Sequence, residues 1–116
     1  MTDDERGAAT AELALAIPLL LSLTVGLVWL LSVGAAQVRM VDAAREAARA
    51  AARGDAVADA EARGERVAPG STVTVVSRDD EVVSTATGSV DPPGGLVGFL
   101  PAVRLHAQAV AATEEP

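Results

Sequence analysis

The chain has 116 residues, a formal net charge of −7 and no cysteine. This length holds one membrane span plus at most one small domain. The acidic balance argues against nucleic acid as a partner, and no disulfide can support the fold. Large apolar side chains concentrate in the first forty residues. We therefore expect the remainder to form a marginal core that leans on a partner or on the chain's own helix.

Residues 13–36 contain no charged side chain. At a helical rise of about 1.5 Å per residue this segment reaches roughly 36 Å, enough for a hydrocarbon core of about 30 Å. It also lacks the polar stripe that a helix of a soluble protein would show. The sequence therefore predicts one membrane-spanning helix, with membrane lipid as a partner.

A cleaved secretory signal peptide is the main alternative for this segment. Gly34-Ala35-Ala36 would serve as its cleavage site. However, the start of the chain is acidic overall, and the apolar run exceeds the roughly 7–15 residues of a signal peptide. We therefore favour a membrane anchor.

The helix is expected to continue past the span through Arg53 and to end at Gly54, a favourable C-cap residue. Arginines recur there at four-residue spacing, and acids three residues before two of them can pair with them: Arg45, Arg49 and Arg53, with Asp42 and Glu46. The alanines between them either face solvent or pack against neighbouring helices. Residues 55–66 either extend the helix weakly or form a linker.

Beyond Pro69-Gly70 the pattern changes to a period of two. Strands are predicted at residues 71–77, 81–90 and 103–111, with a turn at 78–80 and a break at 91–95. A short apolar patch at residues 96–100 is expected to pack back onto the sheet. The predicted fold class is α+β: a long N-terminal helix followed by a small antiparallel sheet of about three strands.

Glu12 stands at the edge of the apolar run. An ionisable group at such a position is costly unless it is paired, so its presence needs a reason. One reason is simple: a carboxylate near a helix N-terminus is favoured by the helix dipole and can reach the interface. The other is functional, namely a charge partner supplied by another chain.

These residues resemble a known family. Arg6-Gly7, four small residues, Glu12 and a long apolar helix follow the pattern of type IV prepilins. Pro18, six residues beyond the glutamate, the segment 41–49 and the closing Ala-Ala-Thr-Glu-Glu resemble TadE-like minor pilins, or pseudopilins, of the tight-adherence (Flp-type) pilus.

The resemblance implies a cytoplasmic leader at residues 1–7, which prepilin peptidase removes by cutting between Gly7 and Ala8. It implies a transmembrane and extended helix at 8–53 with a kink at Pro18, a linker or weak helix at 54–70, and an extracytoplasmic β domain at 71–116. The chain would lie in the cytoplasmic membrane, or in the pilus, with its N-terminus in the cytoplasm. Counting arginines alone would place the C-terminal part in the cytoplasm; we follow the resemblance.

The implied function is that of a minor pilin or pilus-assembly component, whose partners are other pilins and assembly proteins. The new Ala8 amine would meet a neighbour's Glu12. The alternative is a membrane-anchored or secreted extracytoplasmic domain that binds a partner. We expect no enzyme, no cofactor and no metal. His106 is the sole histidine, and the acids at 79–81 are typical of a solvated turn.

Overall fold

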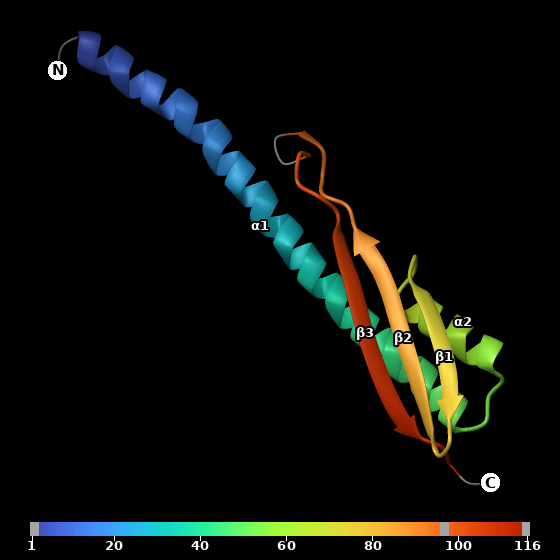
Figure 1. Ribbon diagram of the computed structural model, residues 1–116. Coiled ribbons are helices and arrows are strands. Elements are labelled where there is room, and N and C mark those ends of the chain that lie inside the picture. The colour runs from blue at the N-terminus through green and yellow to red at the C-terminus, as the bar shows by residue number, and fades with distance from the viewer. Residues whose placement is uncertain (1–2, 96–97, 115–116) are drawn as a thin grey trace.

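The computed structural model describes residues 3–95 and 98–114 as a rod of 84 × 20 × 18 Å. Helix α1 (Asp3–Ala52) runs along the whole rod, and its C-terminal half carries a small domain. That domain consists of helix α2 (Val57–Val67) and strands β1 (Thr72–Arg78), β2 (Glu81–Val90) and β3 (Val103–Ala112) (Figure 1). The predicted α+β class is confirmed.

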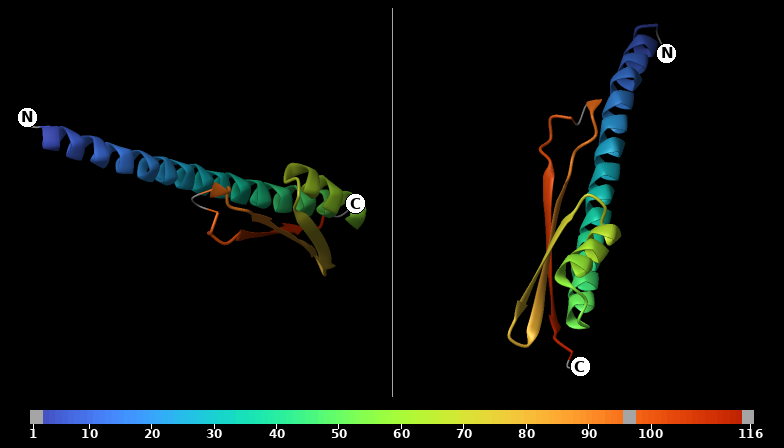
Figure 2. Two further views of the ribbon diagram at one scale, coloured as in Figure 1. Left: turned by 90° about the horizontal axis from the view of Figure 1, so that it is seen from above. Right: turned by 90° about the vertical axis from the view of Figure 1, so that its right-hand side faces the viewer.

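The three strands form one antiparallel sheet in the order β1-β2-β3. Arg78 pairs with Glu81, so that Asp79 and Asp80 form the connecting turn. Arg78 was expected in this turn and instead ends β1. Asp79 adopts a positive φ of 44°, which Asp tolerates better than most residues. Figure 2 shows the sheet lying with one face against the C-terminal half of α1.

The core lies between that sheet face and α1, and it consists mainly of small side chains. Alternate strand residues point inward, and the alanines of α1 face them. The inward set from the sheet is Val73, Val75, Val82, Ser84, Ala86, Leu105 and Ala107, and the fully buried set from α1 is Ala43, Ala44, Ala47 and Ala50. These alanines were expected to face either solvent or neighbouring helices. They pack instead inside their own chain, where the missing side-chain volume lets the sheet and α2 approach α1 closely.

Helix α1 ends where the sequence predicts, in a turn centred on Gly54. The Gly54 amide donates to the Ala51 carbonyl at 3.0 Å, and the Asp55 amide donates to the Ala50 carbonyl at 3.1 Å. Gly54 has a φ of 101°. This pair of bonds is a Schellman motif, which closes the helix and reverses the chain. Residues 57–67 therefore form a separate helix, α2, that packs back against α1.

Ion pairing differs from the expectation. Arg63 of α2 lies 3.5 Å from Glu46 and 3.7 Å from Asp55, joining α2 to α1 and its closing turn. Within residues 3–95 and 98–114, no ion pair links Asp42 to Arg45 or Glu46 to Arg49. The rows of α1 that carry arginine face solvent, and Glu46 is used to hold α2.

The segment that joins β2 to β3 extends beyond the strand ends and lies beside α1, toward its N-terminal half (Figures 1 and 2). Of the apolar patch predicted at 96–100, Leu96 and Val97 lie outside the described residues. Phe99 is 81% exposed, so the expectation that it packs onto the sheet is wrong.

Candidate functional site

Most of the N-terminal half of α1 lies outside the domain that the rest of the described chain forms (Figure 1). It is long and apolar enough to cross a membrane, and none of its most apolar stretch is buried. Its leucines stand free along the rod; Leu15 is 76% exposed and Leu31 is 74% exposed. A continuous apolar surface of this length requires lipid or other chains around it. The helix is therefore compatible with a single-pass membrane anchor.

Gly7 and Ala8 lie in the second turn of α1, and both are exposed. A Cβ built on Gly7 would meet nothing within 4 Å, so nothing in this chain requires glycine there. Glycine in a helix interior costs about 1 kcal/mol relative to alanine. Gly7 therefore lowers the intrinsic stability of the first turns of α1 relative to alanine.

Glu12 is exposed on α1. Across the described part of the chain, its carboxylate has no hydrogen bond and no ion pair. It lies one helical turn after Ala8, about 6 Å further along the axis and on the same face. The acid that the sequence singled out is thus available to a group from outside the chain.

Pro18 lies inside α1, and the helix is continuous through it. Proline has no amide hydrogen, so the Ala14 carbonyl loses its usual helical donor. The kink at Pro18 therefore stays a prediction. The polar residues of the span are satisfied locally: the hydroxyls of Ser22, Thr24 and Ser32 each donate to the carbonyl four residues earlier. None of these three hydroxyls therefore needs a partner from another helix.

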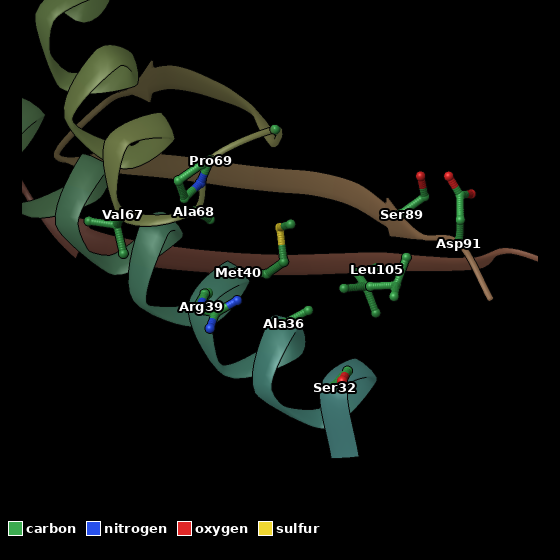
Figure 3. A pocket seen from close by; sticks show the side chains of 12 residues that line it. Ser32, Ala36, Arg39, Met40, Val67, Ala68, Pro69, Ser89, Asp91 and Leu105 are labelled. Carbon is green, nitrogen blue, oxygen red and sulfur yellow. The ribbon is translucent and has the colours of Figure 1, made fainter. Parts of the chain in front are cut away.

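Sequence reasoning missed one feature, an open cavity where the domain meets the exposed half of α1. Figure 3 shows Met40 and Leu105 in this cavity, with Ser89 and Asp91 on one side and Arg39 on the other. A second hollow continues along α1 and brings Pro93 beside Val28 and Trp29. No local pattern signals this meeting of residues some sixty positions apart.

The described residues offer few side chains suited to catalysis or to metal binding. They include no group of three or more His, Asp or Glu side chains that could hold a metal ion. His106 is exposed on the outer face of β3, and its backbone carbonyl accepts a hydrogen bond from the side-chain amide of Gln37 in α1 at 3.0 Å. Asp79, Asp80 and Glu81 are exposed at the β1–β2 turn, as a solvated turn would be.

Comparison with known protein families finds a match over part of the chain. Residues 7–49 match the family model described as TadE-like protein, which confirms the resemblance seen in the sequence. The matched segment begins at Gly7, includes Glu12 and Pro18, and ends in the alanine-rich part of α1. No curated protein and no solved structure matches the chain. The N-terminal segment is thus TadE-like. Members of this family are structural components of the tight-adherence pilus, and the family is not known as an enzyme family.

Proposed function

We propose that this chain is a TadE-like component of the tight-adherence pilus system, namely a minor pilin or pilus-assembly component that assembles through α1. The observation that carries the proposal is the exposed apolar half of α1, headed by Gly7-Ala8 and the available carboxylate of Glu12. This half acts first as a membrane anchor and then as the surface that packs against the helices of other pilins.

The first step is processing by prepilin peptidase between Gly7 and Ala8. The bond lies within α1, so cleavage requires the first turns of the helix to unwind around it. Glycine lowers the cost of that unwinding and presents no side chain to the peptidase. Cleavage removes the acidic leader and creates a positively charged α-amino group at Ala8.

The second step is pairing of that amine with Glu12 of a neighbouring chain. In an apolar surrounding, the attraction between the two charges is strong, whereas either charge alone is costly. A pair of this kind fixes how far one helix is displaced along the next. Glu12 would therefore select register and partner as much as it adds stability.

The third element is orientation, with the domain of residues 54–116 outside the cytoplasm. Arg39, Arg45 and Arg49 lie exposed on the domain side of the span, against the usual arginine bias toward the cytoplasm. The proposal follows from the leader, because prepilin peptidase acts from the cytoplasmic side. Protease added to intact spheroplasts should remove the domain; protection until lysis would refute this orientation.

Intact mass spectrometry of the protein extracted from native membranes tests processing. The expected mass lacks residues 1–7. Gly7→Leu should give the full-length mass, and Gly26→Leu, a control whose Cβ also meets nothing within 4 Å, should be processed as the wild type is. A mature start at Gln37 would establish a signal peptide instead. An uncut wild-type chain would favour a plain membrane anchor.

A further inference from the structure

The segment that joins β2 to β3 (the β2–β3 loop, described at residues 91–95 and 98–102) combines two unusual features. It carries an exposed aromatic residue, Phe99, and it lies beside the half of α1 that is long and apolar enough to cross a membrane (Figures 1 and 2). In a soluble domain such a side chain would be a liability. Beside a membrane span, lipid can surround the same side chain.

Two hollows fix the position of the loop along α1. The loop begins at Asp91, which lines one cavity with Ser32 and Arg39 of α1. Two residues later, Pro93 lines a second hollow with Val25 and Trp29. The loop therefore runs toward the N-terminus of α1, level with span residues. A hydrocarbon core of about 30 Å takes about 20 helical residues; counted from Leu13, it ends near Ser32.

The distribution of charge marks the same boundary on both segments. Going toward the membrane, Arg39 is the last charged residue of α1 before Glu12 at the opposite end of the span. Asp91 is the last charged residue of β2 and its loop before Arg104 on β3. Arg39 and Asp91 line one cavity (Figure 3). From Arg39 and Asp91 toward the membrane, neither α1 nor the β2–β3 loop carries a charged residue within these segments.

We propose that the β2–β3 loop is a second membrane contact, seated at the boundary between headgroups and acyl chains in the leaflet on the domain's side. The inference rests on the proposed function for the anchoring of α1. The loop stays at this boundary because irregular backbone exposed to lipid is not stable deeper in the bilayer. There its amides and carbonyls still reach water, while Phe99 and the prolines face the lipid.

Such a contact would orient the domain. Because the domain packs firmly on α1, one span alone leaves the whole rod free to tilt in the bilayer and to turn about the axis of the span. A second contact, off the axis of α1, fixes which face of the rod points toward the membrane and which points away. The outer face of the sheet would then be presented to the aqueous side.

Fluorescence of the full chain in vesicles tests the proposal, because Trp29 is the sole tryptophan and the chain has no tyrosine. Two single-tryptophan variants are compared with the wild type: Trp29→Phe with Phe99→Trp, and Trp29→Phe with Val76→Trp. Val76 is exposed on the outer face of β1 near the β1–β2 turn, away from the loop. The vesicles contain phosphatidylcholine brominated high on its acyl chains, and the chain is highly diluted so that no second protein covers the loop.

Tryptophan at position 99 should emit at shorter wavelength than tryptophan at position 76, and brominated lipid should quench it. Tryptophan at position 76 should emit as in water and resist quenching. Emission from position 99 equal to that from position 76, with Trp29 still quenched in the wild type, would overturn the loop contact and leave the anchor intact. Absence of quenching at Trp29 would refute the anchor and the loop contact together. Far-UV circular dichroism confirms that each variant keeps the fold.

Discussion

A Cβ atom placed on Gly64 of α2 would lie 2.9 Å from the carbonyl oxygen of Ala43 in α1 and 3.1 Å from both γ-methyl carbons of Val73 in β1. Gly64 thus stands where α2, α1 and the sheet come closest, and no larger residue fits without moving backbone. Local propensity would favour alanine at this helical position by about 1 kcal/mol. The presence of glycine therefore reflects packing between elements.

Gly64→Ala should destabilise the domain by about 1–3 kcal/mol, because overlap with backbone outweighs the gain in helix propensity. Gly88→Ala is the matched control. Its Cβ would lie 2.5 Å from the Met40 methyl carbon, a flexible side-chain end that can move aside. Pulse proteolysis of the full chain in detergent, over a denaturant series, measures both. A larger loss for Gly88→Ala than for Gly64→Ala would contradict this account of the interface.

Two glutamates of α2 protect the free edge of the sheet. The Glu61 carboxylate accepts the Val75 amide at 2.9 Å, and the Glu65 carboxylate accepts the Val73 amide at 3.2 Å. Four helical residues advance about 6 Å, and two strand residues advance about 6.6 Å. The two spacings match, so side chains four apart on α2 reach alternate amides of β1. An edge strand without such cover is a site for aggregation.

Glu61→Ala should lower the free energy of unfolding by about 1–3 kcal/mol, because the amide of buried Val75 then lacks an acceptor. Glu61→Gln keeps an acceptor oxygen and should cost less than half as much. The double variant Glu61→Ala/Glu65→Ala should also self-associate through the bared edge of β1. Pulse proteolysis gives the stability, and sedimentation velocity gives the association. Equal losses for the alanine and glutamine variants would argue against hydrogen bonding as the cause.

Ser84 is fully buried in β2, and among the described residues its hydroxyl has no hydrogen-bond partner. An unsatisfied buried hydroxyl costs about 1–3 kcal/mol. Ser84→Ala should therefore raise the stability of the domain by about 1 kcal/mol, measured by pulse proteolysis. Ser84→Val, which also removes the hydroxyl but adds bulk to a layer built from alanine, should lower it by about 1–3 kcal/mol. A loss of stability in Ser84→Ala would mean that the hydroxyl is satisfied in solution.

Local periodicity predicts much of this fold. Alternation predicts the inward residues of β3, and the glycine at position 54 predicts the end of α1. What the sequence does not reveal is which surfaces meet. From the sequence alone, the alanine face of α1 could be exposed to solvent or could pack against another helix or a sheet. The structure shows that it packs against the sheet and α2, with Val73 and Gly64 in close contact. Likewise, Glu46 pairs with Arg63 rather than with Arg49, because the turn at Gly54 brings α2 back.

Among the candidate site residues, the structure places Gly7, Ala8, Glu12 and Pro18 on one exposed helix without giving any of them a contact outside it. A single chain cannot display an assembly contact, so their roles stay predictions. The β2–β3 loop differs, because the structure places it next to α1 although no sequence pattern predicts that contact. Its position beside Trp29 depends on the length and register of β2 and β3, which bring Pro93 to the level of the span.

The charge of Glu12 gives the sharpest test of assembly. If Glu12 is only an interfacial carboxylate, Glu12→Ala should leave association with partner pilins unchanged, because a polar group simply leaves the edge of the bilayer. If it pairs with a neighbour's Ala8 amine, both Glu12→Ala and Glu12→Gln should reduce that association on the order of tenfold, since each leaves the amine unpaired in an apolar surrounding. Glutamine keeps the size and removes the charge, so it separates charge from packing.

The measurement is crosslinking of partner chains in native membranes, compared with the wild type at equal expression. Leader removal is followed in parallel by intact mass, because the amine exists only after cleavage. Glu5→Gln serves as a control, since under the proposed processing Glu5 belongs to the leader and is lost. Normal crosslinking in both Glu12 variants, with normal processing, would rule out the charge pair while leaving the TadE-like assignment in place. Reduced crosslinking in the alanine variant alone would point to packing at position 12 rather than to charge.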